Sequence, residues 1–243
     1  MEKFNEENSI TFYELQWDTD FFGVSSCKVI LHKPLTLSEW KSLKSRLKDY
    51  QFVSIENRNS EPINSQFIGK DTNAFLADVN IQFKKNILEK KDKPKNVEIY
   101  NALQRNNQIV EMAEFKFSRF IEDPELAKRG GPQVYRQWVI NSFGDVRKYF
   151  ALSKNNNGQV DGFLLHSYKD NVCVVELIAV SENNQHKGIG TSLFSAIEYE
   201  AYKLGCDEIK VGTQIRNTVA INFYHKLGCK QVGCHQIYHL WNL

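Results

Sequence analysis

The sequence predicts an α/β protein in which helices flank a mixed sheet, and three observations lead to this prediction. Strand-like segments rich in β-branched and aromatic residues alternate with segments whose apolar residues recur at helical spacing. Gly205 and Gly228 each end a helical pattern and lead into the next strand. Asn157-Gly158 separates two strand-like segments and indicates an antiparallel hairpin. The chain therefore combines hairpin-linked strands with strand–helix–strand units.

The first part of the chain has the pattern of a small strand–helix unit. Ser38 is the predicted N-cap of a helix, because Trp40, Leu43 and Leu47 follow it at helical spacing. The polar segment 17–20 is predicted to form a turn. The strands predicted around these features are 10–15, 25–31 and 52–56.

A long strand and a lysine-rich segment follow. Phe75 to Phe83 alternates between apolar and polar residues and is predicted to be a strand. Residues 84–96 contain six lysines and Pro94, a composition that favours a solvated linker. We therefore predict two domains, 1–96 and 97–243. The helices predicted next are 99–104, 109–117 and 132–143.

The pattern becomes regular from residue 148 onward. The predicted hairpin joins strands 149–153 and 160–168 through the Asn-Gly turn. A run of apolar residues from Val172 to Val180 predicts a buried strand. The elements predicted after it are helix 191–204, strand 208–214, helix 218–227 and strand 230–241.

Composition and charge exclude several classes of protein. The 243 residues are 42% hydrophobic and 25% charged, as in an ordinary globular protein. Residues 1–100 carry 15 basic and 15 acidic side chains, and residues 101–243 carry 16 and 14, so neither part is suited to bind nucleic acid. No apolar run approaches the ~18 residues that a membrane span needs. Five scattered cysteines without a C-x-x-C pair, and no signal-peptide pattern, favour the cytoplasm.

The cysteines and histidines near the C-terminus only superficially have the spacing of zinc ligands. Cys229 and Cys234 are followed by His235 and His239. Cys234 and His235, however, are adjacent on a predicted strand and therefore face opposite sides. We expect no metal ion.

The loop between the buried strand and the following helix has the features of an anion site. A glycine-rich turn that enters a helix exposes amide groups at the positive end of the helix dipole. Gly188 and Gly190 allow the backbone to approach a phosphate closely. Leu193 stands where the dinucleotide pattern needs its third glycine, and the chain has no G-K-[ST] of a P-loop. A tight strand–helix turn without a ligand is the alternative.

Two motifs resemble those of the Gcn5-related N-acetyltransferase (GNAT) superfamily. The first is Q-x-x-G-x-G, from Gln185 to Gly190, after a strand that ends in Ala-Val. The second comprises Asn217, then Phe223-Tyr224, then Leu227-Gly228-Cys229, with cysteine where phenylalanine is commoner. The resemblance covers about 145–243 and implies a GNAT fold, a mixed and largely antiparallel sheet flanked by helices. Residues 1–96 would form a smaller, partial GNAT-like unit before it.

Shorter motifs over the whole chain resemble the dTDP-fucosamine (dTDP-4-amino-4,6-dideoxygalactose) N-acetyltransferases. This resemblance implies transfer of acetyl from acetyl-CoA to the amine of a nucleotide-linked 4-amino-4,6-dideoxy sugar in surface polysaccharide biosynthesis. Acetylation of protein N-termini or small amines, and a non-catalytic acyl-CoA-binding module, remain as alternatives. A homodimer is compatible with the resemblance. The motifs are Leu15–Gly23, Phe75–Ile81, Ser118-Arg119-Phe120, Tyr135 with Trp138, Thr213-Gln214 and Tyr238–Trp241.

The resemblance also implies which residues hold acetyl-CoA. Backbone amides from the loop would bind the pyrophosphate, with a further contact from Lys187. Ile178, Ala179 and Val180 would pair with the pantetheine arm, and Asn217 would bond it through its amide. A plain helix N-cap is the alternative, or additional, role of Asn217. The loop residues concerned are Gln185, His186, Lys187, Gly188, Ile189, Gly190 and Thr191.

Three residues are candidates for the chemistry. In this superfamily an amine attacks the thioester directly and expels the CoA thiolate through a tetrahedral intermediate. Tyr224 is the implied general acid, or a hydrogen-bond donor to the thiolate; an ordinary core tyrosine is the alternative. Asp78 and Glu176 are alternative bases, Asp78 acting through water. Glu176 is alternatively an ordinary carboxylate of the strand.

Overall fold

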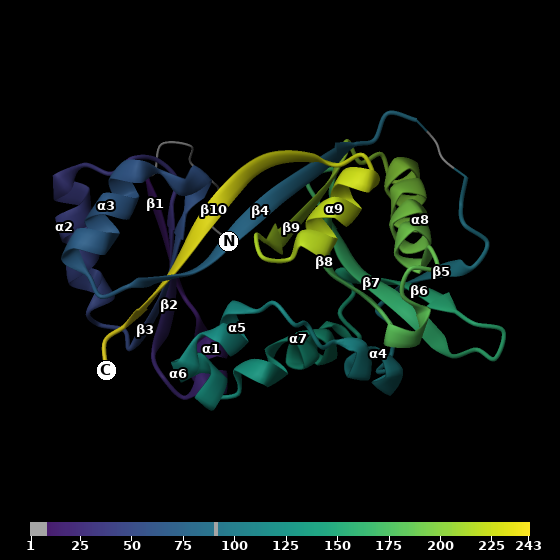
Figure 1. Ribbon diagram of the computed structural model, residues 1–243, viewed down its shortest axis with the longest axis horizontal. Coiled ribbons are helices and arrows are strands. Elements are labelled where there is room, and N and C mark those ends of the chain that lie inside the picture. Colours follow the sequence, from purple (N-terminus) through teal and green to yellow (C-terminus); the bar gives the residue numbers. More distant parts are fainter. Residues whose placement is uncertain (1–8, 90–91) are drawn as a thin grey trace.

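The computed structural model describes residues 9–89 and 92–243, which form one ten-stranded mixed sheet flanked by helices (Figure 1). The strand order is β1-β2-β3-β10-β4-β9-β8-β7-β6-β5, and only β2–β3 and β8–β9 are parallel pairs. The predicted α/β class is therefore confirmed. The strands are β1 (Ile10–Glu14), β2 (Ser26–Leu31), β3 (Phe52–Asn57), β4 (Phe75–Asn86), β5 (Val97–Asn101), β6 (Lys148–Lys154), β7 (Val160–Lys169), β8 (Val172–Val180), β9 (Glu208–Gln214) and β10 (Lys230–Trp241).

Helices cover both faces of the sheet. Phe163 and Leu165 of β7 pack beneath α1, α4, α6 and α7, whereas Leu164 packs beneath α8 on the opposite face. At the other end of the sheet, α2 and α3 lie over β2, β3 and β10. The helices are α1 (Gln16–Phe22), α2 (Leu37–Leu47), α3 (Pro62–Asp71), α4 (Asn107–Met112), α5 (Arg119–Glu122), α6 (Pro124–Lys128), α7 (Val134–Ser142), α8 (Ile189–Lys203) and α9 (Thr218–Lys226).

Two long strands connect the half of the molecule that carries α2 and α3 with the half that carries α8 and α9. In Figure 1, β4 and β10 run across the middle, from the helices α2 and α3 toward α8 and α9. The C-terminal strand β10 lies between β3 and β4, and β4 in turn pairs with β9. The sheet therefore continues across the predicted boundary at residue 96.

Several predicted elements are wrong for reasons of tertiary structure. Residues 99–104 do not form a helix, because 97–101 pair with β6 as the edge strand β5. The predicted turn 17–20 lies within α1, and the predicted helix 109–117 ends at Met112. The helices α3, α5 and α6 were not predicted from the sequence.

The lysine-rich segment is only partly a connector. The strand β4 continues to Asn86, because its last residues pair with β9. Lys84 and Lys85 also form ion pairs with Glu208 and Glu198. Lys90 and Lys91 lie outside the described residues. The N-cap of α2 is Thr36 and not Ser38, since Thr36 and Glu39 form a reciprocal capping box.

Candidate active site

Strands β8 and β9 separate halfway along their length. Their pairing runs only from Val172 to Val175 of β8, after which β8 keeps its contact with β7 and β9 keeps its contact with β4. Glu176 falls at a register shift between β7 and β8, and such a bulge bends a strand and increases its twist. The last residues of β8, Ile178, Ala179 and Val180, therefore have backbone groups on the β9 side that no described strand pairs. This opening can accept an extended ligand as an added strand.

The glycine-rich loop lies at the end of β8 and leads directly into α8. Gly188 is the N-cap at φ 82°, without a side-chain cap, so the first amides of the helix, those of Ile189, Gly190 and Thr191, are not used by a capping side chain. Gln185, His186, Lys187 and Gly188 are exposed. Lys187 Nζ donates to Asn184 Oδ1 at 2.9 Å, which holds the lysine beside the loop. This arrangement suits a phosphate group.

Helix α9 packs against the start of α8 and carries two more of the predicted residues. A Cβ atom on Gly190 would lie 3.2 Å from the ring of Phe223, so a larger residue there would push the ring away by a few tenths of an ångström. Asn217 caps α9, since its Oδ1 accepts the Ala220 amide at 3.1 Å. That bond does not use the Asn217 NH₂ group that a ligand would need. Tyr224 is 3% exposed beside Phe83, and burial raises the pKa of its phenol.

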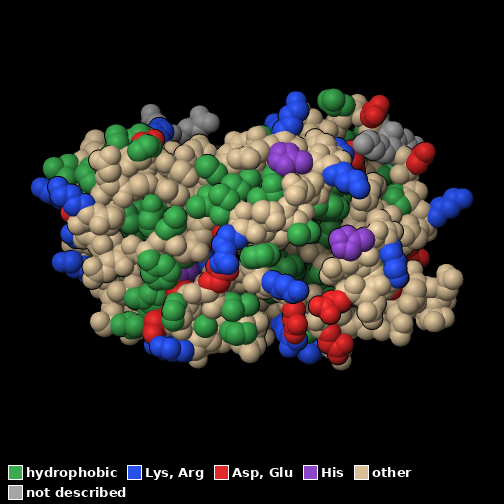
Figure 2. Space-filling model, in the orientation of Figure 1, with side chains coloured by type: hydrophobic (Ala, Val, Ile, Leu, Met, Phe, Trp, Pro, Cys, Tyr) green, Lys and Arg blue, Asp and Glu red, His purple; other side chains and the backbone are tan. Residues whose placement is uncertain are grey.

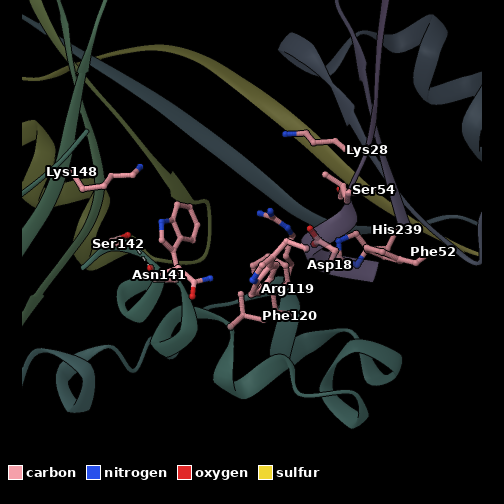
Figure 3. A pocket seen from close by; sticks show the side chains of 14 residues that line it. Asp18, Lys28, Phe52, Ser54, Arg119, Phe120, Asn141, Ser142, Lys148 and His239 are labelled. Carbon is pink, nitrogen blue, oxygen red and sulfur yellow. Dashed lines mark hydrogen bonds between the residues drawn. The ribbon is translucent and has the colours of Figure 1, made fainter. Parts of the chain in front are cut away.

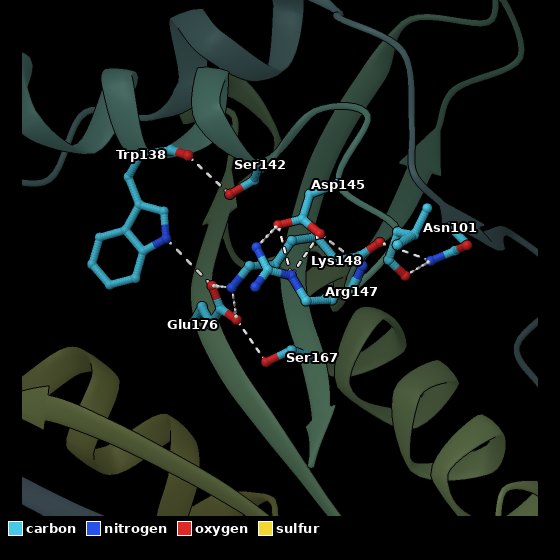
Figure 4. Close-up of polar contacts among 9 residues, drawn as sticks. Asn101, Trp138, Ser142, Asp145, Arg147, Lys148, Ser167 and Glu176 are labelled. Atoms are coloured by element: carbon cyan, nitrogen blue, oxygen red, sulfur yellow. Dashed lines mark hydrogen bonds and ion pairs between the residues drawn. The ribbon is translucent and has the colours of Figure 1, made fainter. Parts of the chain in front are cut away.

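The carboxylate of Glu176 is bound by three side chains (Figure 4). Lys148 Nζ lies 2.5 and 2.7 Å from its two oxygens, and Ser167 Oγ donates at 2.7 Å. Trp138 Nε1 completes the set at 3.3 Å. Glu176 thus lies on β8 at the opening, as the centre of a hydrogen-bonded cluster.

Asp78 lies across the opening from Glu176, on β4 beside the end of β9. It lines a small pocket of about 160 Å³ together with Gln214, Arg119 and Glu122. Its Oδ2 atom is buried without a hydrogen-bond partner in the described residues. Burial raises the pKa of Asp78, although the charge of Arg119 opposes this shift. Asp78 is consequently a stronger proton acceptor than an exposed aspartate.

A larger pocket of about 380 Å³ adjoins the small one, because Arg119 lines both. Lys148, Asn141 and Ser142 lie at one end of it, and Phe52, Ser54 and His239 at the other (Figure 3). Within the described residues the Arg119 guanidinium makes no hydrogen bond or ion pair, whereas Lys148 is bound to Glu176 and Lys28 to Glu56. Trp17 and Trp138 add aromatic surface.

Several residues of this site and of its surroundings were not assigned a role from the sequence. Arg119 and His239 belong to motifs that were quoted for the resemblance, so a signal for them existed. Lys148 carries no pattern, because its partner Glu176 reaches it only through the pairing of β6, β7 and β8. Asp123 likewise meets His239 across 116 residues of sequence.

The charged surface, the helices and the metal-ligating side chains bear on other kinds of site. Acidic and basic side chains are interspersed on the face shown in Figure 2, without an extended patch of one sign. None of the helices in residues 9–89 and 92–243 combines the length and apolar character needed to cross a bilayer. The same residues contain no cluster of three metal-ligating side chains.

Relatives of known sequence resemble this chain over about half its length. Residues 88–229 match the model of the acetyltransferase (GNAT) family. The spore coat polysaccharide biosynthesis protein SpsD of Bacillus subtilis (strain 168) is 27% identical over 135 residues, 55% of this chain and 46% of SpsD. The chain thus spans about half the length of this relative. The uncharacterized protein YdhI of the same strain is 30% identical over 125 residues, 51% of this chain and 70% of YdhI.

Solved structures resemble nearly the whole chain. A GCN5-related N-acetyltransferase from Sphaerobacter thermophilus has a TM-score of 0.64 at 10% identity, over 96% of this chain and 77% of that one. A tandem GNAT protein from the clavulanic acid biosynthesis pathway has a TM-score of 0.58 at 12% identity, over 90% of this chain and 75% of that one. The predicted GNAT fold is confirmed. The family match and this shared fold together show that the chain belongs to the GNAT family of acetyltransferases.

Proposed function

We propose that the protein transfers acetyl from acetyl-CoA to the amine of a nucleotide-linked, dTDP-type 4-amino-4,6-dideoxy sugar for surface polysaccharide. The observation that carries the cofactor part is the opening between β8 and β9, with the glycine-rich loop at its end. The pyrophosphate would bind the amides from Lys187 to Thr191, and the pantetheine arm would pair with Ile178 to Val180. Asn217 would donate its amide to the same arm.

The large pocket supports the acceptor part of the proposal. Its volume of about 380 Å³ lies in the range of small-molecule sites. The tryptophans Trp17 and Trp138 offer surface for a base or sugar ring, and Arg119 offers a guanidinium for a phosphate. The relative SpsD is named for spore coat polysaccharide biosynthesis, which agrees with a sugar substrate.

If the acceptor is a sugar amine, the enzyme needs only a weak base to remove the proton from the amine. An amine with a pKa of about 8 is neutral in roughly one molecule in ten at pH 7, whereas a lysine amine is neutral in about one in 2,500. Asp78, acting through water, is the better candidate for the base, because the oxygens of Glu176 are already bound to Lys148, Ser167 and Trp138. Tyr224 would donate a hydrogen bond to the departing thiolate.

The proposal also includes a division of the chain into two GNAT-like parts. Residues 1–96 would be a partial GNAT-like unit and residues 97–243 the acetyltransferase domain, an arrangement for which the tandem GNAT protein offers a fold-level parallel. The larger pocket takes residues from both parts. The reaction would take place in the cytoplasm, and a homodimer is compatible with the proposal.

Release of CoA thiol measures the proposed activity directly. The purified chain is incubated with acetyl-CoA and with dTDP- and UDP-linked 4-amino sugars, with peptide amines and polyamines as further arms. Turnover of a dTDP-linked amino sugar at a rate well above the peptides supports the proposal. Turnover of peptide amines alone would assign the protein to the N-terminal or small-amine acetyltransferases. Binding of acetyl-CoA without turnover of any amine would indicate a non-catalytic acyl-CoA-binding module.

A further inference from the structure

His239 of β10 is held in a fixed orientation at the end of the large pocket. The side chain is fully buried, and its Nδ1 lies 2.7 Å from Asp123 Oδ2. Trp241 Nε1 donates to the same oxygen at 3.0 Å. The other carboxylate oxygen of Asp123 accepts the amides of Glu125 and Leu126 at the start of α6. The rings of Phe52 and Phe75 contact the imidazole edge-on, with centroids at 5.0 and 5.8 Å.

These contacts determine which nitrogen of His239 carries the proton. Burial works to raise the pKa of Asp123, but the bonds from His239 and Trp241 outweigh it and hold the pKa below its usual range. Asp123 is therefore a carboxylate, which only accepts hydrogen bonds, so Nδ1 must be the donor. Burial lowers the pKa of His239, although Asp123 opposes this shift, so the ring is neutral and Nε2 carries a lone pair.

The Nε2 atom has no partner among the residues that the structure describes, and it belongs to a residue that lines the pocket. It is buried and makes no hydrogen bond with the described residues. A buried acceptor without a donor is destabilising, so a ligand that supplies an N–H or O–H group recovers the lost hydrogen bond. Charged groups nearby are Asp123 and Arg119, and Asp18 and Lys28 line the same pocket.

We propose that His239 is a specificity-determining residue whose Nε2 accepts a hydrogen bond from an N–H or O–H group of the acceptor substrate. Asp123 is then a positioning residue that selects the tautomer. The proposal rests on the proposed function, because it takes the large pocket as the acceptor site. The donor has two sources in a dTDP-linked sugar, the imide of the thymine base and a hydroxyl of the sugar. Arg119 supplies the complementary donor for the phosphates.

The first test compares two buried histidines. His239→Phe removes the acceptor atom, and His239→Gln keeps an acceptor at the same place. His166→Gln is the matched control, since His166 is also fully buried with one unpartnered ring nitrogen but does not line the pocket. We expect His239→Phe to raise the KM for the amino sugar about tenfold and leave the Kd of acetyl-CoA unchanged. Partial recovery in His239→Gln, and no effect in the control, complete the expected pattern.

The second test reads the tautomer in the intact protein. Nitrogen NMR of ¹⁵N-histidine-labelled chain, assigned with His239→Gln, should show an unprotonated Nε2 in the free protein. Addition of dTDP alone should move this resonance if the thymine imide is the donor, and addition of the free 4-amino sugar should move it if a hydroxyl is. In Asp123→Asn the amide can donate to Nδ1, so we expect a population with a protonated Nε2.

Specific outcomes would overturn the proposal. A protonated Nε2 in the wild-type protein, a resonance that neither dTDP nor the sugar moves, or an unchanged KM in His239→Phe would each contradict it. Failure of the proposed function is distinguishable, because the NMR measurement needs no turnover. If peptides are the only acceptors but dTDP still moves the Nε2 resonance, the result supports His239 as a ligand-binding residue and contradicts the proposed substrate.

Discussion

At the scale of single residues, the three groups proposed for the chemistry, Tyr224, Asp78 and Glu176, have different electrostatic surroundings. Tyr224 is buried among apolar side chains, and its raised pKa keeps the phenol protonated as a hydrogen-bond donor. Asp78 is buried with an unpartnered oxygen, whereas Glu176 is saturated with donors. The two carboxyl groups thus have different surroundings. Of the two, only Asp78 has an oxygen without a hydrogen-bond donor among the described residues.

Replacement of Tyr224 by phenylalanine removes the hydroxyl and keeps the ring that packs against Phe83. We expect kcat to fall by more than about tenfold, because one donor to a developing negative charge is lost. The Kd of acetyl-CoA and the melting temperature should stay near those of the wild-type protein. Thiol-release kinetics and a thermal melt test this, and a loss of tenfold or less would remove Tyr224 from the mechanism.

Replacement of Asp78 by asparagine should stabilise the fold while lowering turnover. Because the pKa of Asp78 is raised in the folded state, the folded chain binds this proton more tightly than the unfolded chain. The free energy of unfolding therefore falls as pH rises from about 3.8 through the folded pKa. An asparagine at this position carries no charge, so the variant would not lose stability in this way as pH rises.

Urea denaturation at two pH values measures the effect. We expect the stability advantage of Asp78→Asn over the wild-type protein to be larger at about pH 8 than at about pH 4. Asp49→Asn, at an exposed position on the surface, is the control and should show no such difference. An equal advantage at both pH values would mean that the carboxylate charge is not the cause.

At the scale of elements, the start of α8 depends on backbone conformation more than on side chains. Gly188 has a φ of 82° and caps the helix without a side-chain bond. His186 of the same loop also has a positive φ, of 64°. The loop thereby leaves its amides available at the start of the helix, and a polar side chain at the N-cap would compete with a phosphate for them.

Substitution of Gly188 by alanine tests this role against a matched glycine. Gly158, in the β6–β7 hairpin, has a φ of 77°, and a Cβ at either position would meet no atom within 4 Å. We expect Gly188→Ala and Gly158→Ala to lose similar stability, about 1 kcal/mol each. Only Gly188→Ala should raise the KM for acetyl-CoA. Equal KM values in the two variants would argue against the loop as the pyrophosphate site.

At the scale of the whole molecule, β10 couples the two halves of the chain. It pairs with β3 on one side and β4 on the other, and Tyr238 and Leu240 are buried with the core of α2 and α3. The large pocket takes Phe52 and Ser54 from β3, His239 from β10 and Lys148 from β6. This pocket therefore exists only when both halves are present.

A fragment of residues 75–243 should accordingly not fold as a stable monomer. It would keep both GNAT motifs but would expose Tyr238 and Leu240 and leave one edge of β10 unpaired. We expect aggregation and no cooperative melt by circular dichroism, with recovery when residues 1–74 are co-expressed. A monomeric fragment that melts cooperatively would show that the second half is independent.

The sequence by itself determined the features that depend on local patterns. The helices closed by Gly205 and Gly228, the hairpin at Asn157-Gly158, the apolar strand β8 and the glycine-rich loop follow from periodicity and turn residues, which need no knowledge of distant contacts. The motifs with Asn217 and Tyr224 were identified by their resemblance to those of the GNAT superfamily, which also depends only on the local sequence. Their proposed partners in the cofactor site lie on consecutive elements of the chain.

Only the tertiary structure decided which residues share the large pocket and which lysines belong to strands. The bond between Asp123 and His239 and the cluster around Glu176 join residues that become neighbours through strand order. Residues 97–101 became a strand, and β4 extended to Asn86, because β6 and β9 supplied hydrogen bonds. Glu208 of β9 and Glu198 of α8 supplied ion pairs to Lys84 and Lys85. The differences in intrinsic strand propensity between residues are smaller than the stabilisation that these long-range contacts provide. Pairing in the sheet therefore decides the conformation of these segments.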